Sequence, residues 1–336
     1  MIRRRQFITL LGGGAAASWP LAARAQQPGS MKRVGVLVAG AATESLFQSY
    51  LKAFSDTLSQ AGWIEGQNLR MDVRWNAGDA ELARIYAAQL IGLLPDAILA
   101  SSTTNLTVLR QATSTVPIVF VQVSDPVAQG FVPNLTHPGG NITGFSQYEF
   151  SIAGRWLDLL KQSAPGLRRV AVMFNPDTSP QSKFFMQSVE TAARTLGVQP
   201  VAAPVRSTGE IEPALVRFAS VPNGGLILPT DTFTRLRQEL LIDLALRHQL
   251  PAIGTSDDFA KQGGLIGYIT AGNINMLNEW RRAATYVDRI LKGAKPGDLP
   301  IQQENKYMLI INLKTAKALG LTVPPTVLAI ADEVIE

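Results

Sequence analysis

The chain has 336 residues, and its 31 Lys and Arg against 26 Asp and Glu give a formal net charge of +5. It has no cysteine and two histidines, which excludes disulfides, thiolate metal sites and a cysteine nucleophile and leaves too few imidazoles for a zinc site built on histidine. A chain of this length exceeds one hydrophobic core, so we expect two domains, and we expect neither a metal nor another cofactor.

The first 25 residues have the pattern of a secretory signal peptide. Arginines at positions 3–5 precede a short apolar run at 7–11, and Ala23-Arg24-Ala25 provides a small-x-small exit before Gln26. The last two of these arginines, followed after one spacer by an apolar pair, resemble the twin-arginine export signal, although the general secretory route also fits. The apolar run is too short for a membrane anchor, which needs about 20 apolar residues. We therefore expect cleavage near Ala25/Gln26 and a location in the periplasm.

Without this segment the chain is nearly neutral. The segment holds four of the 31 basic residues and no acidic one, which leaves 27 basic against 26 acidic residues in the mature chain. A neutral chain without a lysine- or arginine-rich run gives no reason to expect nucleic acid or an anionic membrane as a partner. No later stretch is long and apolar enough to cross a bilayer, so we expect no direct membrane insertion.

From Lys32 onward, apolar strands alternate with amphipathic helices. The first strand is continuously apolar, and the helix after it carries Phe47, Tyr50 and Phe54 on one face. Buried strands separated by such helices predict a parallel sheet that is covered on both sides. The expected elements of this half are strands at 34–39, 69–75, 97–100 and 117–121 and helices near 47–58, 82–93 and 104–113.

The same pattern restarts in the second half. The run Lys32-Arg33-Val34-Gly35-Val36-Leu37 is echoed by Arg168-Arg169-Val170-Ala171-Val172-Met173. The expected elements that follow are strands near 198–203, 225–228, 251–254 and 265–268 and helices near 185–196, 209–219 and 233–247. Two similar units in tandem predict an α/β protein of two Rossmann-like lobes with parallel sheets, joined by a hinge. We place the first lobe at 31–147 plus about 272–300 and the second at 148–271 plus about 301–336.

Loops at the strand exits carry the candidate ligand-binding residues. A ligand of an open parallel sheet binds beyond the carboxyl ends of the strands, so two facing sheets would line one cleft with these loops. Most residues there are small and carry a hydroxyl, a carboxamide or a carboxylate, which suits directed hydrogen bonds to a polar solute. The candidates are Ala42, Thr43, Ser101, Ser102, Thr103, Ser124, Asp125, Asn175, Thr230, Asp231, Ser256 and Tyr268.

Two aspartates are candidate partners for a ligand ammonium group. Asp125 and Asp231 each follow a buried strand, one in each half, and a carboxylate in a cleft pairs well with an ammonium. The alternative for Asp231 is an N-cap of the helix that begins near Phe233. We interpret Asp177 and Asp257 as helix caps.

A hydroxyl-rich turn is the candidate site for a ligand carboxylate. Ser101, Ser102 and Thr103 precede a helix whose first N–H groups are free, and such an end attracts anions. Tyr268 stands at a strand exit, where it either stacks on a ligand or packs in the core.

Short runs along the chain carry a family resemblance. They are Ala61-Gly62-Trp63-Ile64-Glu65-Gly66-Gln67-Asn68 with Arg74-Trp75, Val116-Pro117-Ile118-Val119-Phe120 with Asp125-Pro126-Val127, Pro138-Gly139-Gly140-Asn141-Ile142-Thr143-Gly144, and a tail from Ile311 to Leu321 with Pro324-Pro325 and Ala331-Asp332-Glu333-Val334-Ile335-Glu336. Together they resemble a family of ABC-transporter substrate-binding proteins that includes tryptophan-binding members. The resemblance implies a type I periplasmic binding protein with three hinge crossings and closure on a small ligand. It also implies an ABC permease in the inner membrane as partner, a monomer, and no chemistry of its own.

The leading hypothesis is therefore the periplasmic substrate-binding component of an ABC importer. It would bind a small polar organic solute, an amino acid or a small organic acid, in the cleft between the lobes. A ligand-binding sensor module for a membrane receptor would share the bound state and differ in its docking partner. An exported α/β enzyme is disfavoured, because His137 and His248 are poorly placed and no G-x-S-x-G or H-E-x-x-H run is present.

Overall fold

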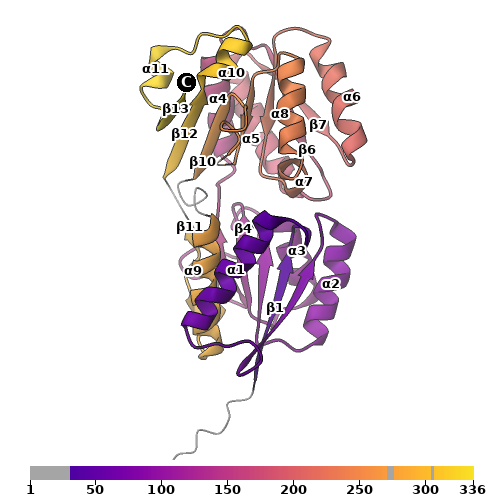
Figure 1. Cartoon of the computed structure of the whole chain (residues 1–336), viewed down its shortest axis with the longest axis vertical. Helices are drawn as coiled ribbons and strands as arrows, with labels where there is room; N and C mark the ends of the chain where they lie inside the picture. Colours follow the sequence, from indigo (N-terminus) through magenta and orange to yellow (C-terminus); the bar gives the residue numbers. More distant parts are fainter. Residues whose placement is uncertain (1–30, 257, 271–275, 304–305) are drawn as a thin grey trace, which may run out of the picture.

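The structure is a computed structural model that describes residues 31–256, 258–270, 276–303 and 306–336. The expected signal segment, residues 1–25, lies outside these ranges, so its cleavage stays a prediction. Two α/β lobes lie one above the other along the long axis of the molecule (Figure 1). Each lobe is built on its own sheet, which confirms the two-lobed α/β fold expected from the repeated strand and helix pattern.

The first lobe is a six-stranded sheet with helices on both faces. In the order in which they lie, its strands are β11 (Gln302–Gln303), β5 (Ile142–Ser146), β4 (Ile118–Val123), β3 (Ala97–Ser101), β1 (Lys32–Val38) and β2 (Leu69–Trp75), and paired strands are parallel. One face packs on α1 (Ser45–Gln60) and α9 (Met276–Leu291), and the other on α2 (Ala80–Gly92) and α3 (Thr103–Ala112). Val36 of β1 packs on the first face and Leu37 on the second, because successive side chains of a strand alternate.

The second lobe repeats this arrangement with seven strands. Their order is β13 (Glu333–Ile335), β12 (Tyr307–Asn312), β10 (Ile266–Thr270), β9 (Ala252–Gly254), β8 (Gly224–Leu228), β6 (Arg169–Phe174) and β7 (Gln199–Pro204). One face carries α4 (Ile152–Ser163), α5 (Ser182–Leu196), α10 (Leu313–Ala318) and α11 (Pro325–Leu328), and the other carries α6 (Thr208–Ala219), α7 (Thr232–Arg235) and α8 (Gln238–Arg247). Val172 of β6 packs on the first of these faces and Met173 on the second, as in β1.

The second sheet departs from the expected parallel arrangement at one pair. β12 runs antiparallel to β10. β11 lies beside β5 and ends on the side of the first sheet that faces the second lobe. The next strand, β12, therefore begins close to the first lobe and runs away from it. β11 belongs to the first sheet and β12 to the second, so the chain passes from one sheet to the other between Gln303 and Tyr307.

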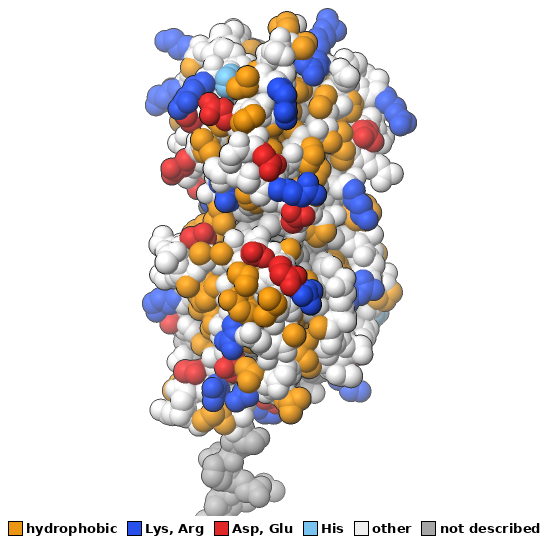
Figure 2. All heavy atoms as spheres, turned by 90° about the vertical axis from the view of Figure 1, so that its right-hand side faces the viewer, with side chains coloured by type: hydrophobic (Ala, Val, Ile, Leu, Met, Phe, Trp, Pro, Cys, Tyr) orange, Lys and Arg blue, Asp and Glu red, His pale blue; other side chains and the backbone are white. Residues whose placement is uncertain are grey.

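The two lobes touch each other directly. The Thr104 hydroxyl in α3 donates a hydrogen bond to the backbone oxygen of Thr178, which follows β6, at 3.0 Å, and both residues are buried. Leu236, next to α7, packs against the hydrophobic cluster of the first lobe. Figure 2 shows the groove between the lobes, with acidic and basic side chains on both of its rims. Within the described part of the chain, no helix has the length and hydropathy needed to span a membrane.

Helix α9 fixes the first lobe through Trp280. This side chain has no exposed surface, and its ring stacks on Tyr50 at a centroid distance of 5.9 Å and meets the edge of Phe54 at 6.5 Å. α9 therefore joins a late segment of the chain to α1.

We predict that Trp280→Ala lowers the free energy of unfolding by about 3–5 kcal/mol, because it leaves a large cavity between α9 and α1. Urea denaturation at equilibrium measures this. The control is Leu94→Ala, whose side chain is 84% exposed, and which should change stability by less than about 0.5 kcal/mol. Equal effects of the two substitutions would contradict the assigned packing.

Candidate functional site

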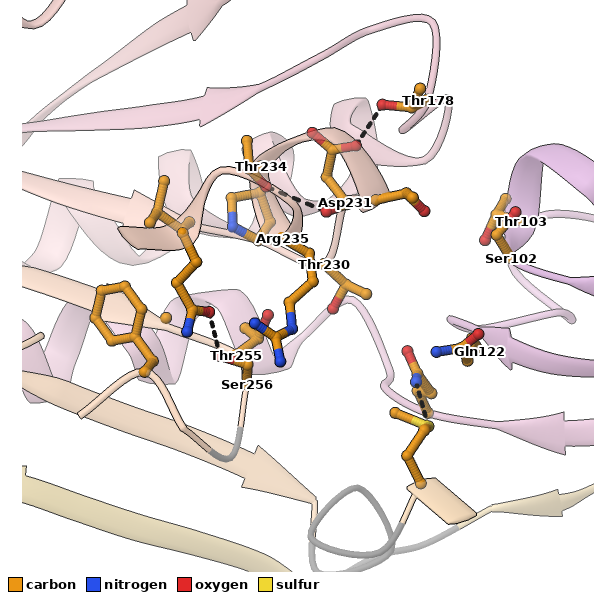
Figure 3. Close-up of a pocket in the computed structure, with 18 of the residues that line it drawn as sticks. Ser102, Thr103, Gln122, Thr178, Thr230, Asp231, Thr234, Arg235, Thr255 and Ser256 are labelled. Carbon is orange, nitrogen blue, oxygen red and sulfur yellow. Dashed lines mark hydrogen bonds between the residues drawn. The ribbon is translucent and has the colours of Figure 1, made fainter. Parts of the chain in front are cut away.

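A cavity lies between the two lobes, at the carboxyl ends of strands from both sheets (Figure 3). The first lobe contributes α1, the start of α3, β4 and the residue after β5, and the second contributes the segments after β6, β8 and β9. The cavity measures about 110 Å³, whereas one water needs only ~10–15 Å³. This space suits a small organic molecule. The described residues include no group of three or more His, Asp or Glu that could hold a metal ion.

Five of the candidate residues line this cavity: Ser102, Thr103, Thr230, Asp231 and Ser256. The Ser102 hydroxyl caps α3 by accepting a hydrogen bond from Asn105 N at 3.3 Å. The hydroxyls of Thr103 and Thr230 are buried and have no hydrogen-bond partner within the described residues. Buried polar groups nearly always find a partner, so these two hydroxyls are suited to a ligand or to ordered water.

Asp231 joins two loops of the second lobe. Its Oδ1 accepts hydrogen bonds from the Thr178 hydroxyl at 2.5 Å and from Phe233 N at 3.1 Å, and its Oδ2 accepts one from Asn175 N at 2.9 Å. It is the N-cap of α7, the alternative that the sequence leaves open, and it is buried. Burial raises the pKa of the Asp231 carboxyl, against the opposing effect of the donors from Thr178, Asn175 and Phe233.

Seven candidate residues do not line the cavity: Ala42, Thr43, Ser101, Ser124, Asp125, Asn175 and Tyr268. Ser101 lies inside the first sheet, where its hydroxyl accepts a hydrogen bond from Ala39 N at 2.9 Å and ties β3 to β1. Asn175 accepts from the backbone of Asp177 at 2.8 Å while donating its own N–H to Asp231. Ala42 and Thr43 are exposed just before α1. The polar groups of Ser101 and Asn175 are thus used within the protein, and Thr43 faces outward. The Ser124 hydroxyl is buried without a hydrogen-bond partner in the described part of the chain, although it lies outside the cavity lining.

Asp125 and Tyr268 also have structural partners. Asp125 has φ +40°, and its carboxylate accepts hydrogen bonds from Ala128 N at 3.0 Å and Phe150 N at 3.4 Å, so it shapes the turn after β4. Tyr268 stacks on Tyr307 with ring centroids 5.5 Å apart, which is the packing alternative. The predicted helix caps have other surroundings: Asp177 pairs with Arg206 at the surface at 3.3 Å, and Asp257 lies outside the described residues.

The residues that form an apolar wall of the cavity are not among the candidates. Phe47 and Tyr50 of α1 line it, together with Phe259 and Met276. The sequence places Phe47 and Tyr50 on an apolar helix face, and both do belong to the first-lobe core. A period of 3.6 residues identifies such a face but does not say which part of it borders a cavity.

Several polar lining residues are also absent from the candidates, namely Gln122, Gln147, Gln181 and Arg235. The side-chain oxygens of Gln147 and Gln181 are buried without a hydrogen-bond partner in the described ranges. Gln147 directly follows β5, so its position would follow from a predicted strand at that point.

Glu279, in the first turn of α9, supports the cavity wall from behind. Its Oε1 accepts a hydrogen bond from Gln122 N at 2.8 Å, and Gln122 has φ +59°, which is strained for a residue other than glycine. Burial raises the pKa of the Glu279 carboxyl to about 7, opposed by the Gln122 N–H, the charge of Arg282 and a hydrogen bond from Gln147. This carboxyl therefore changes protonation near neutral pH.

Comparison with known proteins gives consistent results. A family model described as ABC transporter substrate binding protein matches residues 34–335. A tyrosine-binding protein of Clostridioides difficile (strain R20291) is 24% identical over 336 residues, covering 96% of this chain and 94% of that protein. A solved structure of a conserved domain protein from Vibrio cholerae has a TM-score of 0.79 and 26% identity, over 91% of this chain and 100% of that chain. A Streptococcus pneumoniae ABC domain in complex with L-Trp has a TM-score of 0.76 and 24% identity over the same shares.

We predict that Asp231→Asn lowers the free energy of unfolding of the unliganded protein by about 1–3 kcal/mol, because an amide NH₂ then faces one of the groups that donate to the carboxylate. Thermal unfolding without ligand measures this. The control is Asp177→Asn, at a carboxylate that is 53% exposed, with an expected change within about 0.5 kcal/mol. An unaltered midpoint for the Asp231 variant would remove its assigned role in the loops.

A second prediction concerns pH. The pKa of Glu279 is about 7 in the folded chain against an ordinary value of 4.5, so the folded state binds more protons than the unfolded state between these values. Its favourable contribution is complete below about pH 4.5 and is lost as the pH rises through 7, by up to about 3 kcal/mol. Glu279→Gln keeps an oxygen that accepts from Gln122 and should remove this part of the pH dependence.

Urea denaturation of the wild type and the variant at several pH values between about 5 and 8 tests this difference. Glu190→Gln, at an exposed position of α5, is the control and should leave the wild-type slope in place. Stability curves that stay parallel for the wild type and Glu279→Gln would refute the raised pKa.

Proposed function

The chain belongs to the family of ABC transporter substrate binding proteins, which are not enzymes, and we propose that it is the periplasmic receptor of an ABC importer for a small organic solute. The solute is an amino acid or a small organic acid, and it is held in the cavity between the lobes. The receptor then presents its closed, loaded form to a permease in the inner membrane.

The observation that carries this proposal is a cavity that both lobes line with unpaired polar groups. Four buried polar atoms of lining residues lack a hydrogen-bond partner in the described ranges: the hydroxyls of Thr103 and Thr230 and the amide oxygens of Gln147 and Gln181. Two come from each lobe. Leaving a buried polar group unpaired costs about 1–3 kcal/mol, so a bound molecule that pairs with all four would favour the closed arrangement.

The composition of the walls supports an organic body for the solute. Phe47, Tyr50, Phe259 and Met276 give the cavity an apolar side, while the hydroxyls and amides form a polar side. Small-molecule sites commonly combine such walls with a few oriented polar groups. The tyrosine-binding relative and the relative in complex with L-Trp make aromatic amino acids the first solutes to test.

Export supports the same proposal. The basic, then apolar, then small-residue pattern of residues 1–25 is that of a signal peptide, and the chain has no cysteine for lipid attachment. The mature protein would then lie free in the periplasm as a monomer, next to the permease that it serves.

Two experiments test the proposal. Native mass spectrometry of protein purified gently from the periplasm should show a retained small molecule. Thermal unfolding with L-tyrosine or L-tryptophan should show a raised midpoint for a solute that binds, since ligand at 100 times its Kd stabilises the folded state by about 2.7 kcal/mol. The absence of a retained molecule, together with no shift from any amino acid or organic acid in a broad panel, would contradict the proposed function.

We further predict that Thr104→Val weakens solute binding about twofold to tenfold without altering the cavity, because it removes the hydrogen bond to Thr178 that joins the closed lobes. Isothermal titration calorimetry measures the affinity. Thr191→Val, at an exposed position of α5, is the control and should keep the wild-type affinity. If both variants bind like the wild type, this contact does not contribute to closure.

A further inference from the structure

Arg235 is the single Lys or Arg among the described residues that line the cavity. It is the last residue of α7, and its side chain is 28% exposed. Figure 3 shows its side chain passing Thr230, with the guanidinium near Thr255 and Ser256. A positive charge thus borders a cavity whose other polar lining is mostly neutral.

The guanidinium of Arg235 is held in place by a partly buried network of polar side chains. Its Nη2 pairs with Asp258 Oδ2 at 3.1 Å. Gln238 donates to Asp258 Oδ1 at 2.9 Å and Gln262 to Oδ2 at 2.7 Å, while the Ser256 hydroxyl donates to Gln238. Although burial acts to raise it, the pKa of the Asp258 carboxyl is lowered by Arg235, Gln238 and Ser256, so this carboxylate stays charged.

Most N–H donors of the guanidinium have no hydrogen-bond partner in the described part of the chain. Within the described residues, Asp258 is its one hydrogen-bond partner, while an arginine has five N–H donors in a planar fork. Such a fork matches the two oxygens of a carboxylate, and pairs of this kind are among the stronger hydrogen bonds in proteins. A fixed arginine with unused donors at a cavity wall has the geometry of a carboxylate site.

The cavity offers no comparable partner for an ammonium group. Asp231 is the one acidic residue among its described lining, and both of its oxygens already accept hydrogen bonds from Thr178, Phe233 and Asn175. The remaining acceptors are neutral, namely threonine hydroxyls and the amide oxygens of Gln147 and Gln181. A neutral acceptor forms a weaker hydrogen bond with an ammonium group than a carboxylate does.

We propose that Arg235 binds the carboxylate of the solute, and that the substrates are carboxylic acids with an apolar or aromatic body for which an α-amino group is dispensable. The apolar wall of Phe47, Tyr50, Phe259 and Met276 takes the body of the acid. This inference rests on the proposed function, since it assigns the substrate class of the same cavity.

A panel of matched compounds tests the substrate class by calorimetry on the mature full-length protein. One set is L-tyrosine, 3-(4-hydroxyphenyl)propanoate and tyramine, and the other is L-leucine, 4-methylpentanoate and 3-methylbutylamine. In at least one set, the amino acid and the acid without an amine should bind within about tenfold of each other. The amine without a carboxylate should bind at least about a hundredfold more weakly, the effect of losing a charge-assisted pair.

Variants at Arg235 test the residue with the acid that binds best. Arg235→Gln should weaken it by about tenfold to a hundredfold, and Arg235→Lys by less, because lysine keeps the charge but not the fork. Arg247→Gln, at a side chain that is 62% exposed on α8, is the control and should bind like the wild type. Thermal midpoints of the unliganded variants show whether each is folded.

Three results would overturn the inference: amines that bind as tightly as their acids, a folded Arg235→Gln variant with wild-type affinity, or a panel in which no acid binds. In each case a small molecule retained by the native protein and identified by mass spectrometry would still support the role of solute receptor. A protein that retains nothing and binds nothing would instead contradict the proposed function itself.

Discussion

The rest of this structure depends on one constraint, namely that the carboxyl ends of the strands in the two sheets face each other. The carboxyl ends of parallel strands lie on the same side of a sheet. Here the carboxyl ends of strands from both sheets border the cavity between the lobes. Loops with short polar side chains therefore face each other across a small volume. The hydrogen bond from Thr104 to Thr178 shows how directly the two edges meet. A solute that pairs with groups from both edges stabilises the closed arrangement.

Three carboxylates position the residues around the cavity through hydrogen bonds. Asp231 draws the segments after β6 and β8 together in the second lobe, and Glu279 holds Gln122 in a strained conformation in the first. Asp258 pairs with Arg235 and positions its guanidinium at the cavity wall. Glu279 and Asp258 thus lie behind the cavity wall, while hydroxyls, amides, Asp231 and one arginine belong to its described lining.

Much of the fold follows from the sequence, because β1 and β6 are apolar after their basic first residues and each is followed by a helix with one apolar face. The strand-exit loops also follow from it, and Ser102, Thr103, Thr230, Asp231 and Ser256 do line the cavity. The role of Asp231 does not follow from the sequence, because an aspartate after a strand has the same sequence pattern whether it caps a helix or contacts a ligand. Arg235 lies within a correctly expected helical region, yet its importance depends on Asp258, 23 residues away, and only folding brings the two together.

Small-angle X-ray scattering of the mature protein tests the central claim most directly, namely that the lobes close on a small molecule. The solute identified by mass spectrometry is first removed by denaturation and refolding and then added back at saturation. The account predicts a larger radius of gyration without solute, since no bound molecule then joins the two edges, and a return to the closed value with it. Superimposable scattering curves, with binding confirmed by calorimetry, would contradict closure as the means by which this protein holds its substrate.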